Sequence, residues 1–382
     1  MSDKKLDKSK VLTISAAHMV HDTYSAFLAP LLPLLIEKLG ISLSTTAFLD
    51  IIRRVPALLN PFLGLLAEKT SAKYFVILTP AITAISMSLI GLAPSSIVLF
   101  ILLFVSGISS TFFHIPSPVL IKEASGNRVG VGMSCFMVGG EAARTLGPLV
   151  ITAAVSLWGL EGTYKLIPLG IVASFILYIK LKDIDQYRPA RKAVEKGDSK
   201  KLLKEYRPFF IVIGSFLLFQ SGMKSALTLY LPIYLTSHGE SLWHAGISLS
   251  LLQFFGVIGT FWAGNFSDKI GRSKTLIISS LGSAISMSFF IYTGSLYVLA
   301  LLGLFLFASG PVIMATVQDT NSHMPTFMNS IYMTINFGIS SVIVFGVGLS
   351  GDTLGLESTY LICNILAIGC IPAAYLLTKY VK

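Results

Sequence analysis

Ionisable residues lie inside long apolar stretches of this sequence, where a charge is costly. One stretch contains His18, His21 and Asp22, and a later one contains Glu141 and Arg144. An ionisable side chain at the centre of a bilayer costs at least about 2.5–3.5 kcal/mol on insertion scales, so such residues usually face a partner or a water-filled cavity. The other members of this group are Asp50, Arg53, Arg54, His114 and Lys224.

The helical spacing of these residues predicts acid–base pairs on common helix faces. Asp22 follows His18 by four residues, and Arg144 follows Glu141 by three. A carboxylate that gains and loses such a partner takes up and releases protons, because a nearby cation favours its ionised form. A structural ion-pair network that aligns the helices is the alternative. The residues expected to couple protons are Asp22, Glu141, His18 and His114.

Fixed cations in the same stretches suit an anionic substrate. Arginine keeps its charge at any physiological pH and presents a planar fork of donors. At an offset of 200 residues, the positions that match Asp50, Arg53 and Arg54 are uncharged, so we expect protonation in the first half of the chain. The residues expected to bind substrate or supply counter-charge are Arg54, Arg144, Arg53, Lys224, Gln253, Tyr230 and Asn336.

The apolar stretches are numerous and long enough to cross a membrane. The chain has 382 residues, 53% of them hydrophobic and only 13% charged, against roughly 25% charged in soluble domains. A spanning helix needs about 20 apolar residues. The sequence predicts an all-α membrane protein of twelve transmembrane helices. They cover residues 11–36, 44–67, 75–94, 97–121, 129–156, 162–181, 208–236, 243–267, 274–293, 296–317, 326–350 and 357–380.

The basic residues are distributed unevenly between the loops. The net charge is +10, yet the lysines and arginines gather at the termini, in alternate loops and in one central segment. Only Lys38 and Lys165 fall in loops on the other side. Because positively charged loops stay cytoplasmic, both termini are expected in the cytoplasm of an inner-membrane protein. The charge therefore reflects topology, and no nucleic-acid partner is expected.

A polar segment divides the chain into two similar halves. We expect a six-helix bundle over 1–181, a cytoplasmic linker over 182–207 and a second bundle over 208–382. Gly64–Lys69 matches Gly264–Lys269 at an offset of 200 residues, with a glycine, an acid and a lysine in the same places. Parallel repeats with a site near mid-membrane are a transporter architecture.

The stretch GNFSDKIGRSK, Gly264–Lys274, resembles the signature loop of the major facilitator superfamily. That resemblance implies the major facilitator fold and a cytoplasmic latch that gates without binding substrate. A simple topogenic basic loop is the alternative. The residues assigned to this gating motif are Gly64, Glu68, Lys69, Gly264, Asp268, Lys269, Gly271 and Arg272.

Several first-half stretches resemble the fosmidomycin-resistance-like exporters of that superfamily. They are HMVHDTYSAFLAPLLPLL from His18, the PALLNPFLGLLAEK run from Pro56, FFHIP from Phe112 and GMSCFMVGGEAARTLGPL from Gly132. The TLGPL segment also resembles a Gly-Pro motif of drug–proton antiporters. Ala143 stands in place of that motif's first glycine, so both transport directions stay open.

The sequence therefore predicts a proton-coupled secondary transporter, with export of a small anionic or amphipathic compound by antiport implied by the resemblance. The alternatives are a proton-linked importer of an organic anion and a transport-dead membrane sensor. The chain contains no Walker loop, HExxH or nucleophile elbow, so an enzyme is not expected. No cofactor or metal is expected, and the partners are the substrate, protons and the lipid bilayer around a monomer.

Overall fold

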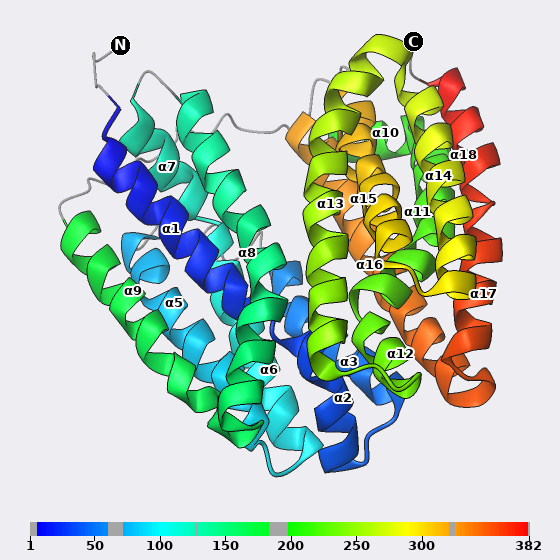
Figure 1. Cartoon of the computed structure of the whole chain (residues 1–382). Helices are drawn as coiled ribbons and strands as arrows, with labels where there is room; N and C mark the ends of the chain where they lie inside the picture. The colour runs from blue at the N-terminus through cyan, green and yellow to red at the C-terminus, as the bar shows by residue number, and fades with distance from the viewer. Residues whose placement is uncertain (1–5, 60–71, 127–128, 183–197, 321–324, 381–382) are drawn as a thin grey trace. The chain divides into compact units, whose positions relative to one another are not determined.

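The computed structural model describes residues 6–59, 72–126, 129–182, 198–320 and 325–380. These residues form helices joined by short turns, and they contain no strand. Ten helical segments among them are long and apolar enough to cross a membrane. The architecture is thus the predicted all-α membrane fold (Figure 1).

Helices of the first half position most of the predicted site residues. They are α1 (Lys8–Ser25), α2 (Leu28–Leu39), α3 (Leu43–Arg54), η1 (Val55–Leu59), α5 (Ala72–Ser88), η2 (Ile90–Leu92), α6 (Ser96–His114), α7 (Ser117–Ser125), α8 (Val129–Trp158), η3 (Glu161–Leu166) and α9 (Ile167–Leu181).

Helices of the second half follow a short helix, α10 (Asp198–Glu205), which lies in the segment expected to be the linker. They are α11 (Arg207–Thr228), α12 (Leu231–Ser237), α13 (Leu242–Ile270), α14 (Arg272–Thr293), α15 (Leu296–Gln318), α16 (Pro325–Leu354), α17 (Leu356–Ala367), α18 (Cys370–Leu376) and η4 (Leu377–Lys379).

Contacts divide the chain into two compact units. The first unit comprises Met1–Ile41, Phe48–Ala190 and Gly239–Ser250. The second unit comprises Ser42–Ala47, Arg191–His238 and Leu251–Lys382. Each unit has its own apolar core cluster, one that includes residues of α1, α6 and α8 and one that includes residues of α11, α14 and α15.

Within the described residues, the structure breaks four of the predicted helices, those over 11–36, 97–121, 208–236 and 357–380, each into two α-helices. The first and third of these breaks occur where a proline removes a backbone bond. The segment predicted over 11–36 is two helices, because Pro30 has no N–H to donate and its ring would clash with the carbonyl of Ala26, directly after α1. Pro232 breaks the segment predicted over 208–236 in the same way after Thr228. Both breaks end a helix that carries ionisable residues.

Glycines allow α8 to lie unusually close to α1, its neighbour in the first unit (Figure 1). A Cβ atom at Gly139 would lie 2.4 Å from the carbonyl oxygen of Ser15, and one at Gly147 would lie 2.5 Å from Cβ of Ala26. Side chains at these positions would force the helices apart. The close approach brings the backbone of α8 to the ionisable face of α1.

Candidate functional site

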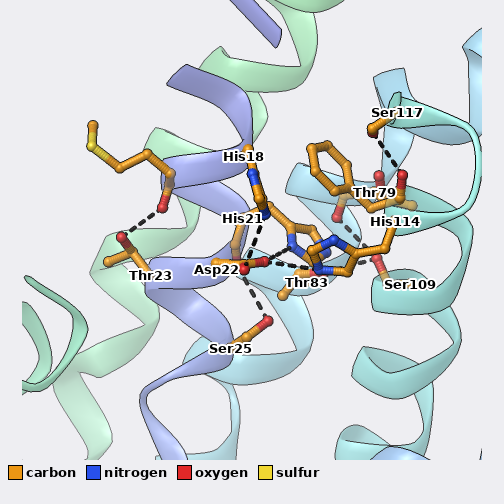
Figure 2. Close-up of polar contacts among 12 residues, drawn as sticks. His18, His21, Asp22, Thr23, Ser25, Thr79, Thr83, Ser109, His114 and Ser117 are labelled. Atoms are coloured by element: carbon orange, nitrogen blue, oxygen red, sulfur yellow. Dashed lines mark hydrogen bonds and ion pairs between the residues drawn. The ribbon is translucent and has the colours of Figure 1, made fainter. Parts of the chain in front are cut away.

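The carboxylate of Asp22 is the centre of a cluster of three histidines in the first unit. Its Oδ2 lies 3.2 Å from Nε2 of His18, and its Oδ1 lies 2.8 Å from Nδ1 of His21 and 3.2 Å from Nε2 of His114 (Figure 2). Asp22, His18 and His21 come from α1, whereas His114 ends α6. The structure therefore brings together three of the four residues expected to couple protons.

Helix α8 fixes the orientation of His18. Nδ1 of His18 lies 2.8 Å from the main-chain carbonyl oxygen of Phe136. The imidazole ring of His18 also stacks on the ring of Phe136, with 3.9 Å between the ring centroids. Because a carbonyl oxygen only accepts hydrogen bonds, Nδ1 of His18 must carry a hydrogen. The other nitrogen, Nε2, then points at Asp22.

The ring of His21 packs against the apolar ring of Phe113. Its ring stacks on Phe113 at 4.5 Å between centroids, and its side chain is fully buried. Within the described residues its Nε2 has no hydrogen-bond partner, although the atom is buried. A neutral His21 that donates from Nδ1 to Asp22 satisfies the polar contact that the described residues give its ring.

The ligand atoms of His18, Asp22 and His114 lie within 4.8 Å of one another, which is close enough for a metal ion. Their nitrogen–oxygen separations of 3.2 Å are hydrogen-bond distances. A third imidazole, that of His21, also bonds directly to the carboxylate. Hydrogen bonds between the imidazole nitrogens and the carboxylate oxygens of Asp22 therefore account for the close spacing of these atoms.

A second ionic group lies on α3 around buried Asp50. Arg53 Nη2 binds its Oδ1 at 3.0 Å, and Arg54 Nη2 binds its Oδ2 at 2.9 Å. Arg53 also donates from Nη1 to the carbonyl of Ser25, directly before the break that follows α1. Both arginines share one carboxylate, so the group keeps a net positive charge, and the Arg54 side chain is 50% exposed.

Glu141 and Arg144 form an ion pair on α8. Nη1 of Arg144 lies 3.1 Å from Oε1 of Glu141, as the spacing of three residues predicts. The Arg144 side chain is 54% exposed, whereas that of Glu141 is 23% exposed. Among the described contacts, no hydrogen bond or ion pair joins Glu141 or Arg144 to the histidine cluster. Its roles in coupling and in substrate binding stay predictions.

Candidate substrate residues of the second unit have different surroundings. Lys224 on α11 lies 5.6 Å from the centroid of the Phe307 ring. Tyr230 is fully buried, and its hydroxyl lies 3.1 Å from the carbonyl oxygen of Leu43 and 3.2 Å from that of Val344. These bonds give Tyr230 a packing role in this structure. Gln253 and Asn336 are half-buried, and substrate contact by these four residues stays a prediction.

The second-half gating motif forms an ionic network at the turn between α13 and α14. Arg272 binds Asp268 through Nη1 and binds Asp319, directly after α15, through Nε at 2.8 Å. Gly271 makes the turn with a φ of +95°, a conformation that favours glycine. Gly264 has open space around it, and Lys269 is exposed. The first-half copy, with Gly64, Glu68 and Lys69, lies outside the described residues.

From the sequence, His21 is among the ionisable residues of the apolar stretches, but not among the residues expected to couple protons. The structure makes it an equal partner of Asp22, since its contact at 2.8 Å is the shortest of the three. Adjacent residues on a helix point in different directions, so spacing alone did not suggest this bond. The glycines of α8 were also missed as packing devices, although a run of small residues opposite a polar face is the signal for close helix approach.

Comparisons with known proteins agree with the fold. Among curated relatives, the chain is 24% identical over 371 residues to the fosmidomycin resistance protein of Escherichia coli K12, with 93% of this chain and 89% of that protein covered. It is 22% identical over 271 residues to the multi-drug resistance efflux pump PmrA of Streptococcus pneumoniae, with 68% and 67% covered.

A solved bacterial homolog of the human lysosomal transporter Spinster, in an inward-facing and occupied conformation, matches with a TM-score of 0.82 at 14% identity. The match covers 99% of this chain and 98% of that structure. The family model of the Major Facilitator Superfamily matches residues 14–345, which is most of the chain. The chain therefore belongs to the major facilitator superfamily, a family of multi-pass membrane transporters rather than enzymes.

Proposed function

We propose that this protein is a proton-coupled antiporter that exports a small anionic or amphipathic compound across the inner membrane by alternating access. The observation that carries the proposal is the cluster in which Asp22 meets His18, His21 and His114. Four titratable groups in direct contact within membrane-spanning helices are costly to bury, and such groups commonly mark a proton path.

Export is supported by the relatives. Two of them are named for resistance to fosmidomycin and for multi-drug efflux. An anionic substrate is supported by the half-exposed guanidinium groups of Arg54 and Arg144, each of which keeps donors beyond its carboxylate contact. Glu141 is the second candidate for proton coupling, because it already pairs with one of these arginines.

The same guanidinium groups would serve a proton-linked importer of an organic anion, which is the second candidate function. Alternating access is reversible, so the direction depends on which gradient drives it. A transport-dead sensor is disfavoured by the ionic network of Arg272 with Asp268 and Asp319, a gating device that a sensor would not need.

The test is transport in inside-out membrane vesicles that contain the full chain. Fosmidomycin is added first, followed by a panel of anionic, neutral and cationic compounds, to vesicles that hold a proton gradient. Dissipation of the gradient by an anionic or amphipathic compound, together with uptake of that compound, supports export by antiport. Uptake that instead requires the opposite gradient supports import, and no proton movement with any transported compound contradicts proton coupling.

A further inference from the structure

The partners of His18 limit where a proton can reside in the Asp22 cluster. Nδ1 of His18 faces the carbonyl oxygen of Phe136 at 2.8 Å, and Nε2 faces Oδ2 of Asp22 at 3.2 Å. A carbonyl oxygen and an ionised carboxylate both accept hydrogen bonds and donate none. Only an imidazolium, with a hydrogen on each nitrogen, satisfies both contacts at once.

We propose that the coupled proton is carried by His18 as an imidazolium, while Asp22 stays ionised as its counter-anion. The inference rests on the proposed proton coupling and goes further, because it assigns the proton to one ring and gives Asp22 a positioning role. Figure 2 shows His18, His21 and His114 directed at the Asp22 carboxylate.

The competing arrangement places the proton on Asp22, which would then donate to a neutral His18. The other oxygen of Asp22 argues against it. Oδ1 lies within hydrogen-bond distance of His21 Nδ1 at 2.8 Å and of His114 Nε2 at 3.2 Å. Donors aimed at a carboxylate stabilise its ionised form. The proton therefore remains on nitrogen.

The other two histidines are poorer carriers. A second proton on His21 would reside on Nε2, a buried atom without a polar partner among the described residues, and a buried unpaired donor is costly. His114 is 40% exposed and makes its contact through one nitrogen. Because His114 is the most exposed of the three histidines, it suits delivery of the proton to Asp22 and His18.

When His18 loses a proton, its ring can keep only one of its two hydrogen bonds, the one to Asp22 of α1 or the one to Phe136 of α8. If the remaining hydrogen stays on Nδ1, the Nε2 lone pair faces the carboxylate of Asp22 and that contact is lost. If it moves to Nε2, the bond to Phe136 of α8 is lost. Proton release is thereby linked to the contact between α1 and α8, the kind of change that a transporter needs.

Other ionisable groups lie on the helices packed against α1. Glu141 and Arg144 of α8 bind each other, and Lys73 of α5 donates to the carbonyl of Lys182. The remaining charged side chains that the structure describes there are Glu123 on α7 and Lys180 on α9. Two ionisable side chains in the described part of the chain contact His18 directly, those of Asp22 and His114.

The test uses the full-length protein in lipid nanodiscs and no transported compound. The protein carries ¹⁵N-labelled histidine and ¹³C-carbonyl-labelled phenylalanine, and solid-state NMR spectra are recorded across a pH titration. A through-space correlation between His18 Nδ1 and the Phe136 carbonyl identifies His18 without any substitution. Infrared spectra of the same samples report the carbonyl stretch of a protonated carboxylic acid, with Asp22→Asn as the subtraction and His238→Gln as the control.

We expect His18 to show two protonated nitrogens at low pH and to lose one as the pH rises. Asp22 should contribute no protonated-acid band at any pH, so the infrared spectra of the unaltered protein and of Asp22→Asn should not differ in that band. A titrating band of that kind, or a His18 ring that keeps one protonated nitrogen at every pH, would overturn the proposal. Because neither readout requires transport, a failure here is distinct from a failure of proton-coupled export in vesicles.

Discussion

Gly140 of α8 lies directly against the imidazole of His18. A methyl group at position 140 would lie 2.6 Å from Cε1 of that ring. The ring cannot move away freely, because its two nitrogens are held by Phe136 and Asp22. The absence of a side chain at position 140 is therefore a condition for the geometry of the site.

Replacing Gly140 by alanine should destabilise the protein by about 1–3 kcal/mol, the usual cost of overpacking. The matched control is Gly310→Ala, since Gly310 lies inside α15 with open space around it. That control should be neutral or stabilising by up to about 1 kcal/mol. Denaturant unfolding of the purified variants in detergent measures both. Equal stability of the two variants would show that His18 is not held in place.

The gating network predicts a loss of rate rather than of affinity. Asp268→Asn removes one of the two carboxylates that bind Arg272. Conformational exchange should slow because the network can no longer form and break as a unit, while substrate binding stays unchanged. Single-turnover transport and equilibrium binding separate the two effects. Glu240→Gln, which removes an exposed charge beside His244, is the control, and a parallel loss of binding in Asp268→Asn would refute the gating role.

Anion recognition is tested by neutralising one cation at a time. Arg144→Gln and Lys224→Gln should each weaken binding of an anionic substrate about 10- to 100-fold, since a hydrogen bond to a charged group contributes about 1.5–3 kcal/mol. Binding of neutral analogues should change less. Lys165→Gln is the control, because Lys165 also lies over an aromatic ring, that of Trp158. Equal losses for charged and neutral ligands would indicate structural damage instead.

The fold followed from composition, because apolar stretches of about 20 residues leave few alternatives in a bilayer. The pairs His18–Asp22 and Glu141–Arg144 also followed, since residues three or four apart share a helix face. The contact of His18 with Phe136 could not be predicted, because the two residues are 118 positions apart in the sequence and the contact is made by the main-chain carbonyl oxygen of Phe136. Nor could spacing reveal that Tyr230 is fully buried, which depends on tertiary packing.

Membrane orientation can be tested with single cysteines at positions predicted to lie on opposite sides of the membrane. A cysteine at position 38, in a variant that lacks Cys135, Cys363 and Cys370, should react with an impermeant maleimide added outside the cell. A cysteine at position 204, in α10, should react only in inside-out vesicles. The reason is that basic loops remain cytoplasmic, whereas Lys38 belongs to a sparsely basic side. Labelling of position 38 from the cytoplasmic side would reverse the assignment.

The most direct measurement is substrate-evoked proton movement in vesicles that contain Asp22→Asn, compared with Glu141→Gln and with the unaltered protein. Asp22→Asn removes the anion that three histidines contact, so we expect it to abolish proton-driven transport while substrate binding or exchange remains. Glu141→Gln should also uncouple transport, through its contact with Arg144. If both variants still move protons together with substrate, coupling lies elsewhere in the chain and the role given to the Asp22 cluster is wrong.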